Sequence, residues 1–150
     1  MKKEINLKEV ELAAESLYKR GGFSCSESVM STIIDCFELQ IPKEVIALTS
    51  GFSGGIGKSG CTCGALAGGV MALGIFFGRS EEGDPKVKKN HELTNELYQA
   101  FYTRTEKDAV CCRVLTKGFD MEVGEHKNHC SKYVGFIARK VAEIIIRENA

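Results

Sequence analysis

An uncharged stretch near the middle of the chain constrains the fold most strongly. Residues 61–78 (CTCGALAGGVMALGIFFG) contain no charged side chain, although Lys58 and Arg79 flank them closely. A helix that is apolar on every side must be buried, either in protein or in lipid. The stretch is at the lower limit of spanning length, its five glycines and two cysteines keep it only modestly hydrophobic, and no basic cluster marks one side. We therefore expect no membrane span but a buried helix over about residues 62–77.

Periodicity predicts that the rest of the chain is also helical. Apolar residues recur at helical spacing, and no alternation of period two extends far enough for a strand. Ser24 with Glu27 three residues later is typical of a capping box, so a helix should begin there. Pro42 should open a short helix with Val45, Ile46 and Leu48 facing inward. The other predicted helices cover residues 6–19, 85–105, a short segment near 111, and 130–147. These patterns indicate an all-α fold, a single domain over residues 1–150 built as a bundle of five to six helices around a central apolar, glycine-rich helix.

Charge and cysteine content narrow the function classes. Lys and Arg total 20 and Asp and Glu total 20, so no overall field attracts nucleic acid or an anionic membrane. The N-terminal residues carry charges every few positions and no apolar signal core, which predicts a cytoplasmic protein. The seven cysteines are an odd number and fit poorly with a closed disulfide framework. In a reducing compartment, such density is more typical of metal binding or thiol chemistry.

The positions of the cysteines are more informative than their number. A helix N-terminus presents free N–H groups and the positive end of the helix dipole, which favour a thiolate and lower the pKa of a cysteine. Thiolates attack disulfides and bind iron, zinc or copper. Cys36 lies near a helix end among apolar residues and is expected to fill the core. The cysteines predicted to lie at helix starts are Cys25, Cys63, the pair Cys111 and Cys112, and Cys130.

A single cysteine on a helix is more often an inert small hydrophobe than a reactive group, but repeated placement at helix starts favours a functional set. Cys61 and Cys111 neighbour stronger candidates and are spare partners, which could ligate, resolve or do nothing. Neither Cys61-Thr62-Cys63 nor the adjacent Cys111-Cys112 would form an unstrained disulfide.

Two histidines and two glycine motifs are further candidate sites. His126 and His129 precede Cys130 and could add nitrogen ligands, although solvent-facing loop histidines are the commoner explanation. Gly57-Lys58-Ser59 lacks the earlier glycine of a P-loop, and the G-x-G-x-x-G pattern over residues 55–60 lacks the strands of a dinucleotide fold. The glycines are better explained as a loop over residues 51–60 that passes close to Cys63.

The run Cys63-Gly64-Ala65-Leu66-Ala67-Gly68 resembles the signature of the C_GCAxxG_C_C family of redox proteins. The resemblance covers nearly the whole chain and implies that the family's cysteines correspond to Cys25, Cys63, Cys112 and Cys130, with Cys111 as the rival of Cys112. It also implies a redox role without an agreed reaction. A related module in split-Soret cytochromes carries an iron–sulfur cluster, which favours a cluster here. The chain has no C-x-x-C-H site for covalent haem.

Three functional hypotheses follow. In the first, Cys25, Cys63, Cys112 and Cys130 bind an iron–sulfur cluster, with zinc as the alternative, and exchange electrons with a partner protein. In the second, the chain is a thiol–disulfide protein whose catalytic cysteines are Cys63, as the reactive thiol, and Cys25. In the third, it is a non-catalytic helical interaction module. The sequence leaves open whether the chain is an oxidoreductase or an electron-transfer protein. A homodimer is compatible with the apolar helix, part of which a second copy would cover.

Overall fold

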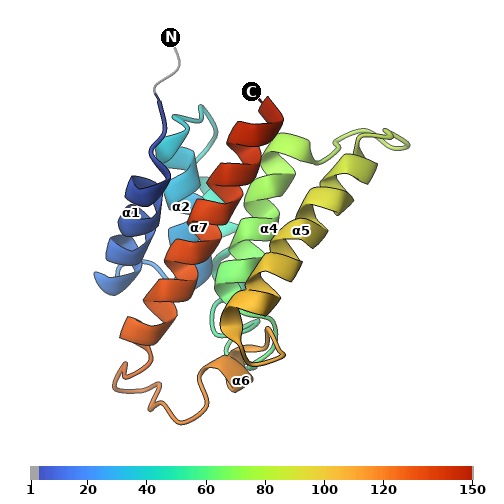
Figure 1. The fold of residues 1–150 in the computed structure, drawn as a ribbon. Coiled ribbons are helices and arrows are strands. Elements are labelled where there is room, and N and C mark those ends of the chain that lie inside the picture. The colour runs from blue at the N-terminus through green and yellow to red at the C-terminus, as the bar shows by residue number, and fades with distance from the viewer. Residues whose placement is uncertain (1–3, 150) are drawn as a thin grey trace.

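Five long helices pack side by side in a computed structural model that describes residues 4–149 (Figure 1). They are α1 (Leu7–Lys19), α2 (Cys25–Cys36), α4 (Gly64–Phe77), α5 (Val87–Thr105) and α7 (Lys127–Asn149). Two four-residue helices, α3 (Glu44–Ala47) and α6 (Cys112–Leu115), and a short 3₁₀ helix, η1 (Ser50–Phe52), lie in the connections. Over residues 4–149 the only β-pairing is an isolated antiparallel bridge between Thr62 and Cys111. The all-α prediction is confirmed.

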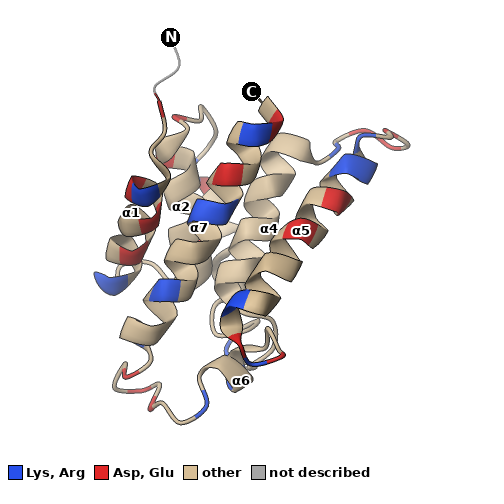
Figure 2. Cartoon of the chain, viewed as in Figure 1, with Lys and Arg blue, Asp and Glu red and all other residues tan. Residues whose placement is uncertain are grey.

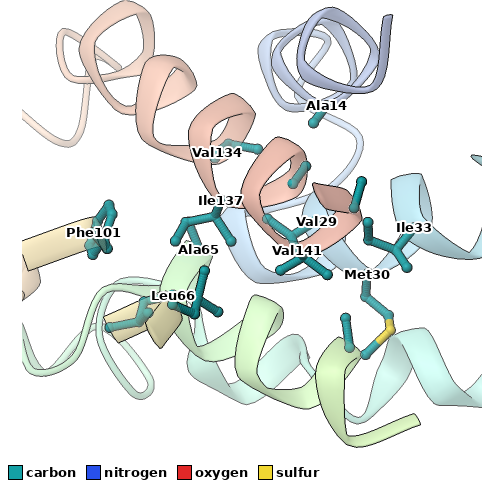
Figure 3. Packing of buried hydrophobic residues seen from close by; sticks show 14 of the residues in the cluster. Ala14, Val29, Met30, Ile33, Ala65, Leu66, Phe101, Val134, Ile137 and Val141 are labelled. Atoms are coloured by element: carbon teal, nitrogen blue, oxygen red, sulfur yellow. The ribbon is translucent and has the colours of Figure 1, made fainter. Parts of the chain in front are cut away.

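Helix α7 is central to the packing, since it contacts α1, α2, α4 and α5. An apolar stripe along this helix is buried, with side chains 0–1% exposed: Val134, Ile137, Val141, Ile144 and Ile145. Figure 3 shows Val134, Ile137 and Val141 of this stripe packed among Val29 of α2 and Ala65 of α4. One hydrophobic core therefore joins the long helices.

The uncharged stretch forms α4, which contacts α2, α5 and α7 and carries no charged residue along its length (Figure 2). Its glycines allow close helix approach. A Cβ on Gly68 would lie 2.6 Å from the Ser26 carbonyl oxygen of α2, and one on Gly69 would lie 2.6 Å from Ile137 Cγ2 of α7. Among the described helices, none is both long and apolar enough to cross a membrane.

Several element boundaries and orientations differ from the predictions. Leu48 is 66% exposed rather than inward, because the helix that Pro42 was expected to open is a single turn that buries none of its residues. Helix α7 begins at Lys127, three residues before Cys130. The predicted start of α2 is correct: the Ser24 N–H donates to Glu27 Oε1 at 2.9 Å.

The up-and-down course of the chain brings several helix starts to one end of the bundle. Figure 1 shows the starts of α2, α4 and α7, together with α6, at the end opposite the C-terminus of α7. The loop over residues 51–60 lies at the same end. This arrangement positions the candidate site.

Candidate functional site

A cavity of about 860 Å³ opens among these helix starts, and Cys25, Cys63, Cys112 and Cys130 all line it. They come from α2, from the residue before α4, from α6 and from α7. Residues separated by up to 105 positions in the sequence (130 minus 25) therefore share one pocket. The structure brings together the four cysteines that the sequence predicted as one site.

Cys25 and Cys63 lie against the same short stretch of backbone. Cys25 is the first residue of α2, and Cys63 is the N-cap of α4 and only 8% exposed. A Cβ on Gly64 would overlap the Cys25 Sγ and would lie 2.9 Å from the Phe52 carbonyl oxygen. A glycine directly after Cys63 is therefore what lets the α2 thiol lie beside the start of α4.

The bridge between Thr62 and Cys111 identifies the site member of the Cys111–Cys112 pair. The Cys63 N–H donates to the Val110 carbonyl at 2.8 Å, and the Cys112 N–H donates to the Cys61 carbonyl. Successive side chains of paired extended segments point to opposite faces. Cys63 and Cys112 line the pocket, whereas Cys111, which is paired with Thr62, does not.

Cys130 reaches the pocket from the first turn and a half of α7 rather than from its start. The nearby His129 ring lies between Phe119, at 5.0 Å between ring centroids, and Tyr133, at 4.9 Å. Its Nε2 atom is 3.2 Å from the Leu115 carbonyl oxygen. His129 therefore connects the beginning of α7 with the end of α6 through these contacts, and it is not a solvent-facing loop residue.

The expected lowering of the cysteine pKa values is wrong for the protein without a bound cation. Burial raises the pKa of Cys63 and of Cys25. Backbone N–H groups oppose this effect, because they hydrogen-bond to the sulfur and favour its thiolate. These N–H groups belong to Ala65 and Leu66 at Cys63, and to Gly54 at Cys25. Burial also raises the pKa of Cys112, and that of Cys130 to about 12. The desolvation of buried thiols outweighs the helix N-terminus, so Cys63 is not a low-pKa attacking thiol.

The glycine loop has an unusual backbone. Residues 54–58 all have positive φ, between 57° and 75°, and they include Lys58 and the β-branched Ile56. This left-handed backbone conformation raises the conformational energy of residues other than glycine. It brings Gly54 and Gly60 to the pocket wall. The loop therefore passes close to Cys63 as predicted, and residues 4–149 contain no strands that could support a dinucleotide site.

Other polar groups complete the lining of the pocket. Tyr18 is 6% exposed, and burial together with the four cysteines raises the pKa of its hydroxyl group. The Lys127 ammonium group lies 5.7 Å from the centre of the Tyr18 ring. His126 also lines the pocket, and its Nδ1 atom is buried without a hydrogen-bond partner among the described residues. The sequence signal for His126 was its position four residues before Cys130.

The remaining cysteines lie outside the pocket lining. Cys36 is the last residue of α2 and packs against the hydrophobic core, as predicted. It lies about 16 Å along the helix from Cys25, at 1.5 Å per residue. Cys61 is exposed and Cys111 is half-buried.

Comparisons with known proteins give a family for the chain and a solved structure of similar fold. Residues 23–144 match the family described as "Putative redox-active protein (C_GCAxxG_C_C)". The split-Soret cytochrome c from Desulfovibrio desulfuricans, whose structure is described as containing a novel iron centre, has a similar fold: the TM-score is 0.73 at 22% identity, over 97% of this chain and 70% of that chain. No curated protein sequence is significantly similar. Because the family match covers most of the chain and includes the four pocket cysteines, the protein belongs to the C_GCAxxG_C_C family of redox-active proteins.

Proposed function

We propose that Cys25, Cys63, Cys112 and Cys130 bind an iron–sulfur cluster and that the protein exchanges electrons with a partner protein. The observation that carries this proposal is the shared pocket, in which four thiols from four separate elements meet at one end of the bundle. The cluster would supply one-electron redox chemistry that no side chain of this chain provides. The protein's part is to ligate it, to hydrogen-bond to its sulfurs and to limit the access of water.

The chemistry of the donor set suits such a cofactor. Soft thiolate ligands select iron–sulfur clusters, zinc and copper(I). The raised pKa values mean that the thiols are neutral without a cation, and a bound cation supplies the charge that displaces their protons. Backbone N–H groups of Gly54, Ala65 and Leu66 already face the cysteine sulfurs. In iron–sulfur proteins, hydrogen bonds of this kind tune the reduction potential.

The spacing of the donors favours a cluster over a single zinc ion. Across residues 4–149, no three His, Cys, Asp or Glu side chains are close enough to hold one metal ion as they stand. Sulfur ligands around a cluster lie further apart than those around one ion, because several irons and sulfides lie between them. The cavity of about 860 Å³ leaves room for such a group. The similar fold of a split-Soret cytochrome described as having an iron centre supports the same proposal.

Anaerobic purification and reconstitution with ferrous iron and sulfide test the proposal directly. The expected result is coloured protein with bound iron and acid-labile sulfide, and serine in place of any one of the four pocket cysteines should remove most of the iron. Cys36→Ser and Cys111→Ser are matched controls outside the pocket lining and should retain it. Colourless protein without iron after reconstitution would contradict the proposal. Binding of zinc without sulfide would replace the cluster by a mononuclear site.

A further inference from the structure

The backbone of Cys61 lies next to that of the pocket cysteine Cys112. In the pairing around Thr62 and Cys111, the Cys112 N–H donates to the Cys61 carbonyl. Cys61 and Cys112 flank the bridged pair on one side, and Cys112 is also the first residue of α6. This hydrogen bond holds their backbones together. A Cβ on Gly55 would lie 2.5 Å from the Cys61 backbone nitrogen and 2.9 Å from the Cys112 Cβ, so both cysteines pack against one glycine.

We propose that Cys61 and Cys112 form a thiol–disulfide couple. The Cys112 N–H donates to the Cys61 carbonyl, while the Cys61 N–H donates to the Gly55 carbonyl. One such backbone hydrogen bond sets the two Cα atoms on the order of 5.5 Å apart, as in neighbouring antiparallel segments. That separation lies within the usual range of about 4.4–6.8 Å for disulfides. The Cys61 Sγ lies 3.9 Å from Thr62 Oγ1, so a rotation about its Cα–Cβ bond has to bring the sulfur toward Cys112. Exposed side chains rotate in this way on the picosecond to nanosecond timescale.

The exposure of the two thiols sets the order of the reaction. Cys61 is exposed, whereas Cys112 is half-buried in the pocket wall. With a low-molecular-weight disulfide RSSR as oxidant, the Cys61 thiolate attacks one sulfur, which gives a mixed disulfide Cys61–S–SR and releases RS⁻. The Cys112 thiolate then attacks the Cys61 sulfur and releases the second RS⁻. The two cysteine protons pass to the released thiolates, so two thiols and RSSR become one protein disulfide and two RSH.

Other pairings of Cys61 are less favourable. Cys63 is 8% exposed and is held by the hydrogen bond from its N–H to the Val110 carbonyl. A bridge from Cys61 to Cys63 would also close a very short ring with a strained geometry. Cys111 is paired with Thr62 and does not line the pocket. Among residues 4–149, Cys112 is the cysteine whose backbone hydrogen-bonds directly to that of Cys61.

The couple would regulate the pocket, a consequence that rests on the proposed function. A disulfide between Cys61 and Cys112 takes one of the four ligands out of the site, and reduction returns it. Oxidised protein should accordingly hold no cluster until a thiol reductant restores Cys112. The exposed cysteine would then act as a sensor of the disulfide state around the protein.

Peptide mapping of the metal-free protein tests the couple without any cofactor. After chelator treatment, the protein is incubated with oxidised glutathione, the remaining thiols are blocked, and trypsin is added without reductant. Trypsin cuts after Lys58, Arg79, Lys107 and Arg113. The couple is then recovered as peptide 59–79 linked to peptide 108–113, two hydrogens lighter than the sum of the two. Fragmentation should assign the bond to Cys61 and Cys112, and the number of free thiols should fall by two.

Variants decide which cysteines are involved. Cys61→Ser should abolish the linked peptide and the loss of two thiols, whereas Cys111→Ser, as the matched control, should retain both. Helical circular dichroism checks that each variant is folded. Persistence of the linked peptide in Cys61→Ser, or a glutathione adduct on Cys61 that never resolves, would overturn the proposal. If the disulfide forms but reduced protein binds no iron, the couple stands and the iron–sulfur proposal fails.

Discussion

The contact between Gly68 of α4 and Ser26 of α2 gives a sharp test of how the bundle is packed. In Gly68→Ala, the new Cβ would lie 2.6 Å from the Ser26 carbonyl oxygen and 3.0 Å from its Cα, and both atoms belong to backbone that cannot turn aside. Overpacking of a filled core costs about 1–3 kcal/mol. Because the new Cβ meets backbone rather than a flexible side chain, we expect Gly68→Ala to cost about 3 kcal/mol by this effect. Alanine in place of glycine within a helix stabilises the helix by about 1 kcal/mol. The expected net loss is about 2 kcal/mol.

Gly74 of the same helix provides the control. A Cβ at Gly74 would meet no atom within 4 Å, so Gly74→Ala should gain the helix propensity of about 1 kcal/mol without a clash. The propensity contribution is common to both variants. Their difference of about 3 kcal/mol therefore measures the overpacking alone.

Thermal and urea unfolding of the metal-free protein measures both effects. At about 2–4 °C per kcal/mol for a chain of this length, Tm should fall by about 4–8 °C in Gly68→Ala and rise by about 2–4 °C in Gly74→Ala. An equal rise in both variants would show that α2 and α4 are further apart than the structure has them. The reasoning about the buried face of α4 would then be refuted.

Three further predictions concern surface and loop contacts. Arg147 hydrogen-bonds to Glu96 and lowers the pKa of the Glu96 carboxyl group from 4.5 to about 2. The stabilisation of the folded state by this ion pair is therefore present above pH 4.5 and is lost as the pH falls toward 2. Glu96→Gln should cost about 0.5 kcal/mol at pH 7, since the pair is largely exposed, and its difference from wild type in urea unfolding should shrink with acidification. His129→Ala removes the contact with the Leu115 carbonyl and two aromatic contacts. It should lower the stability measured in thermal unfolding by about 2 kcal/mol. An unchanged Tm would contradict the role given to this ring. Ile56→Gly relieves a φ of 67° on an exposed β-branched residue and should stabilise the protein by about 0.5–1 kcal/mol; a loss in denaturant unfolding would show that the loop is not strained.

The sequence predicted the long helices well because their signals are local. Hydrophobic periodicity and the Ser24–Glu27 capping box depend only on neighbouring residues, and the structure bears both out. Leu48 was misjudged because a one-turn helix has too little surface to bury a full face. The start of α7 was placed too late because His129 is held by Phe119 and Leu115, which lie outside the predicted helix.

The gathering of Cys25, Cys63, Cys112 and Cys130 in one pocket was predictable, but the electrostatics of this pocket were not. Placement at or near helix starts identified Cys25, Cys63, the pair Cys111 and Cys112, and Cys130, and it separated them from Cys36. The family resemblance favoured Cys112 over Cys111. The direction of the pKa shifts was not predictable, because it depends on how deeply the packed bundle buries each sulfur. The contact between Cys61 and Cys112 likewise depends on a bridge between segments about 50 residues apart in the sequence.

The left-handed loop has a consequence for anyone who wishes to alter the pocket. The N–H of Gly54, which hydrogen-bonds to the Cys25 sulfur, belongs to the main chain at a φ of 65°. Proline is the one genetically encoded residue without this N–H, and its ring fixes φ near −65°. No ordinary substitution can therefore delete that donor and keep the shape of the loop. Removing it would require chemical synthesis, with an ester linkage in place of the amide.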